Sequence, residues 1–162
     1  MVHLGADACI IGRNVEKTES MAKSIATARS GAKVIGIGAI DVRSIDSLMA
    51  AVDRCVAELG GIDFVMYVAS TPDSPGLETM HRSIVYLWAY SVGSAGAAGN
   101  FLATINQLSA NAFKSVIDID VLGSYNTLKA TIPHLVKSAE KHKSDGRTGG
   151  FPFSSIKTNS YI

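Results

Sequence analysis

Apolar residues form three short runs within the first 66 residues, and each run predicts a strand. The runs cover residues 8–12, 33–40 and 62–66. In the second run the apolar residues are continuous rather than alternating, which is typical of a parallel strand that is buried on both faces. Between them, residues 14–30 and 44–60 carry apolar side chains at the period of an α-helix. Strands that alternate with helices of this length predict right-handed βαβ units. The expected fold class is therefore α/β, with a doubly wound parallel sheet.

The pattern changes in the second part of the chain. Residues 70–76 are rich in turn formers, and residues 77–92 could form a helix. No charged residue occurs from 83 to 113, and the segment 84–102 is apolar enough to raise a membrane span. The small residues at 93–100 and the lack of a nearby Lys or Arg cluster favour buried core followed by a loop. No membrane span is expected.

A long helix is expected after this stretch. Ser109 is a suitable N-cap, and apolar positions at the helical period continue into the 130s. Gly123 and Pro133 are expected to bend this helix. Residues 151–156 could form a last strand, although Pro152 argues against a central place in a sheet.

Composition narrows the class of protein. The 162 residues are 47% hydrophobic and 18% charged, which predicts one globular domain. A net charge of +1 with scattered charges predicts no nucleic-acid partner. Cys9 and Cys55 are expected to be reduced thiols, and the four histidines share no ligand spacing, so no metal site is expected. The first residues do not resemble a secretion signal, which favours a place inside the cell.

Candidate chemistry lies just past the predicted strands, because ligands of α/β folds bind at the carboxyl ends of the strands. Arg13 follows the first strand, where an Arg accommodates the 2′-phosphate of NADP; the alternative is a solvated Arg at the start of a helix. Asp41 follows the second strand and either accepts from an adenine amino group or caps the residues Arg43 and Ser44. The small residues 95–101 either approach a flat ligand or form a plain loop.

Two other patterns are better explained without a ligand. Gly36 and Gly38 lie inside a predicted strand, so they are not a phosphate-binding loop. Tyr125 and Lys129 have the spacing of a Tyr-x-x-x-Lys motif, but they lie in the helix before the one that carries this pair in short-chain dehydrogenases. A pair on the helix surface is the preferred interpretation.

Four segments together resemble the peroxisomal 2,4-dienoyl-CoA reductases, particularly those of fungi: residues 4–14, 41–43, 97–101 and 109–120. The resemblance implies a Rossmann-like fold of the short-chain dehydrogenase/reductase superfamily. It implies NADPH-dependent reduction of a 2,4-dienoyl-CoA substrate to a trans-3-enoyl-CoA in the β-oxidation of unsaturated fatty acids. Hydride goes to the δ carbon, and a proton goes to the α carbon of the resulting dienolate. The family also implies a peroxisomal location and a homo-oligomer.

The same resemblance assigns roles to individual residues. Arg13 and Asn14 would contact the phosphate side of NADP, and Asp41 would contact the adenine. Asp120 matches the family acid that, with a lysine, holds the water acting as proton donor. Val42 and Ala97 complete the expected cofactor-binding set, and the acyl-CoA path would be lined by Arg43, Phe101, Ser109, Ala110 and Asn111.

The sequence also departs from the family pattern. The family begins with a strand and a glycine-rich phosphate loop, which this chain does not show, and that strand would lie between those of Ile10 and Phe64. We expect residues 1–162 to be a single partial NADP-binding domain with a gap in its sheet. Residues 67–94 are interpreted as an insertion, for which a retained intron is one hypothesis, and residues 151–162 as a divergent tail without the family's targeting tripeptide.

Three functions stay open at this point. The first is the dienoyl-CoA reductase, with this chain alone expected to be inactive because the family lysine is missing. The second is a non-catalytic piece that associates with other subunits through the long helix. The third is another NADP-dependent short-chain reductase, which would need a Ser, Tyr and Lys set in an order that the chain does not contain.

Overall fold

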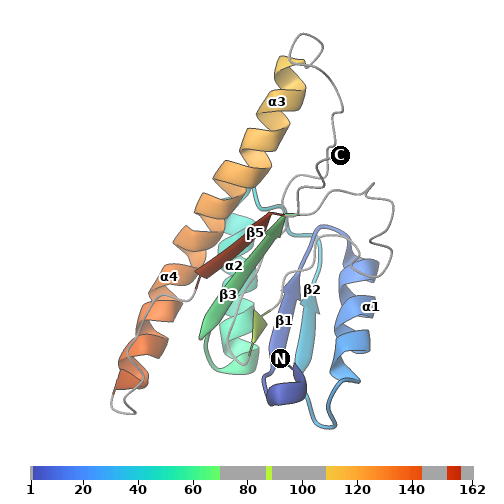
Figure 1. The fold of residues 1–162 in the computed structure, drawn as a ribbon, viewed down its shortest axis with the longest axis vertical. Helices are drawn as coiled ribbons and strands as arrows, with labels where there is room; N and C mark the ends of the chain where they lie inside the picture. Colours follow the sequence, from blue (N-terminus) through green and yellow to red (C-terminus); the bar gives the residue numbers. More distant parts are fainter. Residues whose placement is uncertain (1, 70–86, 89–108, 144–152, 158–162) are drawn as a thin grey trace.

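The chain forms parallel strands joined by helices, as predicted (Figure 1). The computed structural model describes residues 2–69, 87–88, 109–143 and 153–157. Its elements are a 3-10 turn (Val2–Leu4), β1 (Ala8–Ile11), α1 (Val15–Ala26), β2 (Val34–Ile37), α2 (Ile45–Leu59), β3 (Phe64–Ala69), β4 (Leu87–Trp88), α3 (Ala110–Val116), a π-helix (Ile117–Leu122), α4 (Gly123–Lys141) and β5 (Phe153–Lys157). The predicted α/β class is confirmed.

The described strands belong to two separate sheets. In one, β1 pairs parallel with β2, in a register from Ala8 opposite Val34 to Ile11 opposite Ile37. In the other, β3 pairs parallel with β5 on one side and antiparallel with the two residues of β4 on the other. Within the described residues β1 and β3 are not paired, and β4 lies between them, because it pairs with β3 and also contacts β1. The sheet is therefore interrupted at the place where the sequence predicts a gap.

Both faces of β1 are covered, which explains its continuous apolarity. All four of its residues are buried. Cys9 and Ile11 belong to the main core, which also contains buried residues of β2, α2, β3 and α4. Ala8 and Ile10 point to the opposite face, since successive side chains of a strand alternate. Burial on both faces was predicted for residues 33–40, and there it holds only in part, because Ile37 is buried while Val34, Ile35 and Gly36 of β2 are half-buried.

Three parts of the structure differ from the expectations or extend them. Leu87 and Trp88 form a strand, so the helix expected at 77–92 is wrong at these two residues, while residues 77–86 and 89–92 lie outside the described part. Strand β3 continues to Ala69, three residues into the segment interpreted as an insertion. The last strand exists as β5, which begins at Phe153 and is an outer strand among the three described strands of its sheet, while Pro152 lies outside the described residues.

The long helix after Ser109 is present and is interrupted by a π-helical turn. The hydroxyl of Ser109 caps it by accepting from Ala112 N at 3.1 Å, as predicted. The π-helix ends immediately before Gly123, and Pro133 lies inside α4. No helix of the described residues has both the length and the apolar character needed to cross a membrane.

Several of the apolar positions of this helix do not face the core. Phe113, Ile117, Val121, Tyr125 and Ile132 are exposed, and we call this set the apolar stripe. The face that packs against the rest of the molecule is instead made of small and polar residues followed by one leucine: Gly123, Asn126, Thr127, Ala130, Thr131 and Leu135.

Candidate functional site

The turn after β1 is closed by hydrogen bonds that fix the start of α1. The side chain of Asn14 caps the helix by accepting from Lys17 N at 2.9 Å, and Thr18 Oγ1 donates to Asn14 O at 2.6 Å. Gly12 N donates to Ile37 O, and Ile40 N donates to Gly12 O, each at 3.1 Å. These bonds hold the carboxyl ends of β1 and β2 side by side. Arg13, between the two anchored positions, is exposed.

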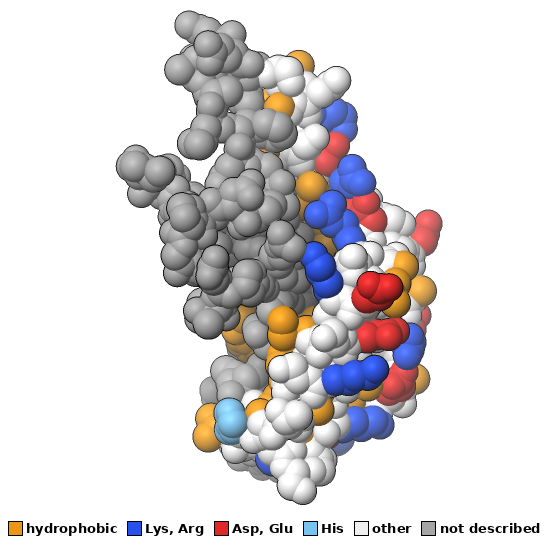
Figure 2. Space-filling view, turned by 90° about the vertical axis from the view of Figure 1, so that its right-hand side faces the viewer, with side chains coloured by type: hydrophobic (Ala, Val, Ile, Leu, Met, Phe, Trp, Pro, Cys, Tyr) orange, Lys and Arg blue, Asp and Glu red, His pale blue; other side chains and the backbone are white. Residues whose placement is uncertain are grey.

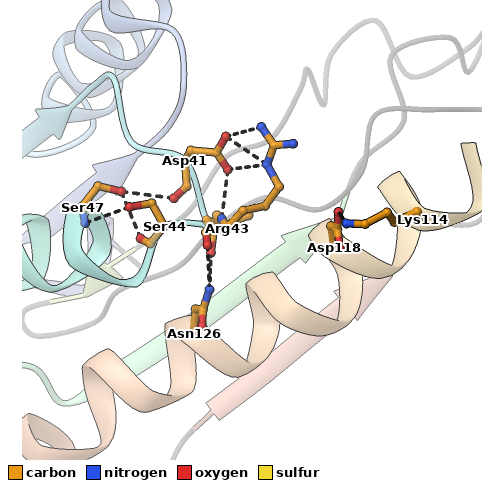
Figure 3. A network of polar contacts seen from close by, with 8 residues as sticks. Asp41, Arg43, Ser44, Ser47, Lys114, Asp118 and Asn126 are labelled. Carbon is orange, nitrogen blue, oxygen red and sulfur yellow. Dashed lines mark hydrogen bonds and ion pairs between the residues drawn. The ribbon is translucent and has the colours of Figure 1, made fainter. Parts of the chain in front are cut away.

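The turn after β2 is organised by an ion pair between Asp41 and Arg43 (Figure 3). The Arg43 guanidinium donates to both carboxylate oxygens, with Nη2 at 2.5 Å from Oδ2, and Arg43 N donates to Oδ1 at 2.9 Å. These bonds hold the pKa of Asp41 below its usual value, an effect that partial burial opposes and the Arg13 guanidinium reinforces. Arg13, from the first turn, therefore acts on the carboxylate of the second.

Val42 lies between these two charged residues and has a different environment. Its side chain is buried in the main core. Its carbonyl accepts a hydrogen bond from Asn126 Nδ2 of α4 at 3.0 Å, and the carbonyl of Arg43 accepts from the same nitrogen at 3.2 Å. A contact of Val42 with a cofactor stays a prediction, and it would have to use groups other than these two carbonyls.

Asp120 lies in the π-helix, half-buried, on the element that connects α3 with α4. Ser124 Oγ donates to its main-chain carbonyl at 2.5 Å. Asp118, two residues earlier, forms an ion pair with Lys114. The pKa of Arg43 is raised mainly by Asp41 and to a smaller extent by the charge of Asp118. π-Helical turns are common at functional sites because they re-aim side chains within a helix. The residues Ser109, Ala110 and Asn111 are exposed at the start of α3, which extends beyond the carboxyl ends of the strands (Figure 1).

The structure brings some of the predicted site residues together and leaves others untested. Arg13, Asp41, Val42 and Arg43 meet at the carboxyl edge of β1 and β2. The link between this edge and the π-turn that carries Asp120 is the electrostatic effect of Asp118 on Arg43. Ala97 and Phe101 lie outside the described residues. Arg43 N donates to Asp41 Oδ1, which fits the alternative in which Asp41 caps residues 43 and 44, whereas the ion pair of the two side chains was not foreseen.

Asn126 is the site residue that sequence reasoning missed. It is buried and joins α4 to the turn after β2, 84 residues away from Val42. The sequence contained one signal for it, because Asn126 lies on the same helical face as the small residues Gly123 and Ala130. This signal does not identify the group to which the amide is hydrogen-bonded. Tyr125 and Lys129 are both exposed on α4, which agrees with their interpretation as a surface pair.

Charged side chains elsewhere are mixed in sign. On the face seen in Figure 2, Lys and Arg side chains alternate with Asp and Glu over the described residues. Among the described residues, no three His, Cys, Asp or Glu side chains gather as a metal-binding group.

Comparisons with known proteins give a consistent family. The sequence profile of the short chain dehydrogenases matches residues 1–146. The peroxisomal 2,4-dienoyl-CoA reductase of Saccharomyces cerevisiae is 40% identical over 139 residues, which are 85% of this chain and 38% of the yeast protein. The corresponding Danio rerio enzyme is 33% identical over 125 residues, 77% of this chain and 32% of that protein. The chain thus spans well under half the length of these relatives.

Solved structures show the same fold at lower identity. An alcohol dehydrogenase from Thermococcus sibiricus, complexed with 5-hydroxy-NADP, matches with a TM-score of 0.55 and 18% identity, covering 81% of this chain and 43% of its own. A 3-ketoacyl-ACP reductase from Sinorhizobium meliloti matches with a TM-score of 0.56 and 22% identity, covering 80% and 39%.

Proposed function

Because the chain belongs to the short-chain dehydrogenase family, we propose that it carries part of a peroxisomal reductase that uses NADPH to reduce 2,4-dienoyl-CoA esters. The sequence relatives from yeast and fish, at 40% and 33% identity, have this activity in their names. The observation that carries the proposal is the meeting of Arg13 and Asp41 at the carboxyl edge of β1 and β2, where nucleotides bind in sheets of this kind.

The residues at this edge fit the adenosine end of NADPH. Arg13 is exposed, and no hydrogen bond of its guanidinium is recorded to the described residues, so its donors are available to a 2′-phosphate. Asp41 is ionised and has four acceptor sites on its two oxygens. Arg43 uses several of them, so an adenine amino group would share the carboxylate with Arg43 or displace it. Asn14 has already committed its side-chain oxygen to the helix cap.

The proposed chemistry divides between the cofactor and the chain. NADPH supplies the hydride for the δ carbon of the dienoyl group. The role proposed for Asp120 is to hold, with a lysine, the water that protonates the α carbon. Its half-buried place on a π-turn suits this role, because partial exclusion of water favours directed proton transfer. Ser109, Ala110 and Asn111, with Arg43 and Phe101, would line the acyl-CoA path.

Ligand binding by the purified chain tests this proposal, because turnover is not expected of this chain alone. A 2,4-dienoyl-CoA should raise the melting temperature of the chain in the presence of NADPH, since a ligand that binds the folded state stabilises it. Asp120→Asn, which changes a group proposed for proton transfer and not for binding, should leave this rise unchanged. Arg43→Ala, which changes a residue on the proposed acyl-CoA path, should reduce it. No rise in the unchanged chain, or equal rises in the unchanged chain and in Arg43→Ala, would contradict the proposal.

A second function, a subunit that associates through its long helix, is favoured by the apolar stripe. Its five residues are exposed although apolar, with 60% of Tyr125 and 56% of Phe113 accessible. Contiguous exposed apolar surface marks protein–protein contacts. We propose that a second copy of the chain covers this stripe, which is compatible with the reductase function and also stands without it.

A further inference from the structure

The turn that holds Asp41 and Arg43 is fixed through its main chain. The carbonyl of Asp41 accepts from Ser44 N at 3.0 Å and from Ser47 Oγ at 3.2 Å. The carbonyls of Val42 and Arg43 both accept from Asn126 Nδ2 (Figure 3). All three carbonyls of residues 41–43 are thus hydrogen-bonded, and one side chain from α4 satisfies two of them.

Asn126 differs from the other buried polar residues of α4. Thr127 and Thr131 are fully buried, and their hydroxyls donate to main-chain oxygens of their own helix, at 2.8 Å each. Those bonds stabilise α4 locally and reach no other element. Asn126, which is 5% exposed, directs its amide away from its helix to a turn 83 and 84 residues earlier in the chain. Burial of an amide is favourable only when it is hydrogen-bonded, so the helix and the turn depend on each other.

The same helix carries the charged residues of the π-turn. Asp120 lies less than two turns before Asn126, and the charge of Asp118 acts on the Arg43 guanidinium. The turn after β2 is hydrogen-bonded to this helix by the Asn126 amide, which donates to two of its carbonyls. A displacement of the helix at Asn126 would break these two bonds, so the positions of the turn and the helix depend on each other.

We propose that Asn126 is a positioning residue that fixes the turn of residues 41–43 against the helix bearing Asp120, and thereby sets the distance between the cofactor edge and the acid. The role of this distance in a reaction rests on the proposed function, whereas the fixing of the turn does not. A nucleotide bound at Asp41 would stabilise the turn that Asn126 holds, and loss of the amide would weaken nucleotide binding because the turn would have to be ordered on binding.

Amide hydrogen exchange in the full chain, without any ligand, measures how strongly Asn126 holds the turn of residues 41–43 in place. In Asn126→Leu, which keeps the volume and removes the donor, we expect exchange at the amides of Arg43 and Ser44 to become about tenfold faster, since two buried carbonyls lose their partner. The matched control is Thr131→Val, which removes a buried hydroxyl on the same face of α4. It should lower stability without a selective change at Arg43 and Ser44.

Fluorescence titration with NADPH measures the effect of Asn126 on nucleotide binding. We expect the Kd for NADPH to rise about tenfold in Asn126→Leu and to change less than threefold in Thr131→Val. Asn126→Gln, which keeps the amide, should recover part of the loss. Equal exchange at Arg43 and Ser44 in the unchanged chain and in Asn126→Leu would overturn the inference. If NADPH fails to bind even the unchanged chain, the proposed function fails, and the exchange data still decide the role of Asn126.

Discussion

The Asp41–Arg43 pair determines the charge of the candidate nucleotide edge. Arg43 donates to both oxygens of a carboxylate that the Arg13 guanidinium also stabilises, so the Asp41 pKa is below its usual value. An ion pair at a partly exposed place adds little to stability, because water screens it. Its effect is on geometry: it holds the carboxylate in one orientation, ready to accept from a ligand that replaces Arg43.

Replacement of Arg43 by Ala should raise the pKa of Asp41 toward its ordinary value. The stability that an acid with a lowered pKa contributes is present above the pKa of the unfolded chain and is lost as the pH falls through the folded value. The unchanged chain should therefore lose a small amount of stability below about pH 4, the ordinary range of an Asp, and Arg43→Ala should lose less. NMR titration of the Asp41 carboxyl carbon measures the shift. Arg54→Ala, which removes a partner of Glu58, is the control, and an unmoved Asp41 titration in Arg43→Ala would contradict the assignment.

At the scale of elements, glycines allow α1 to approach β2 closely. A Cβ at Gly38 would lie 2.4 Å from Val15 Cα, and one at Gly36 would lie 2.8 Å from Thr18 O. Both obstacles are main-chain atoms of the helix, which no side-chain rotation can remove. Gly36 and Gly38, which do not form a phosphate-binding loop, thus allow the main chain of α1 to pack closely against β2.

Gly38→Ala should lower the free energy of unfolding by about 2 kcal/mol or more, because overpacking at a main-chain contact forces α1 away from the sheet. Gly12→Ala is the matched comparison, since the nearest atom there, at 2.6 Å, is the side-chain hydroxyl of Thr18. Urea denaturation of both variants checks this. A loss at Gly38 that is no larger than the loss at Gly12 would show that the close approach is not needed.

The elements before residue 66 could be predicted from the sequence, and the placement of the long helix could not. Continuous apolar runs and helical periods are local signals, and they gave β1, α1, β2, α2 and β3. In the long helix, the 3.6-residue spacing of apolar residues identifies an apolar stripe. It does not show whether the core or another chain covers that stripe. The helix packs inward with Gly123 and Ala130, whose small side chains allow a close approach, and with threonines that satisfy their own hydroxyls. For the same reason Asn126 could not be assigned, because its partners are set by the tertiary fold.

On the scale of the whole molecule, two features are incomplete within the described residues. Among these residues, the strands β1 and β3 are not paired with each other, and the apolar stripe is not covered by another element. The described strands have the order β2-β1 and β3-β5, with two residues of β4 between β1 and β3, and this agrees with a doubly wound sheet in which no described parallel strand joins β1 to β3. The apolar stripe lies on the element that borders the candidate site. Association through the stripe would therefore also stabilise the conformation of the π-turn that carries Asp120.

The chain should self-associate through the apolar stripe. Ile132→Glu places a charge on the stripe, away from the π-turn, and should raise the dimer Kd at least about tenfold, because an unpaired charge at a buried contact is costly. Met49→Glu, at an exposed apolar residue of α2, is the matched control and should leave the Kd unchanged. Sedimentation velocity at several concentrations measures this. A monomer at every concentration, or equal effects of the two variants, would contradict the assignment of the stripe.

The central claim is that the edge formed by Arg13 and Asp41 selects NADPH, and thermal unfolding with each nucleotide tests it most directly. A ligand that binds only the folded state raises the melting temperature, and at equal concentration the ligand with the lower Kd raises it more. NADPH should raise the Tm of the unchanged chain more than NADH at equal concentration, and Arg13→Ala should remove the difference, whereas Arg54→Ala should keep it. A Tm that neither nucleotide moves, or an equal rise with both, would contradict the account.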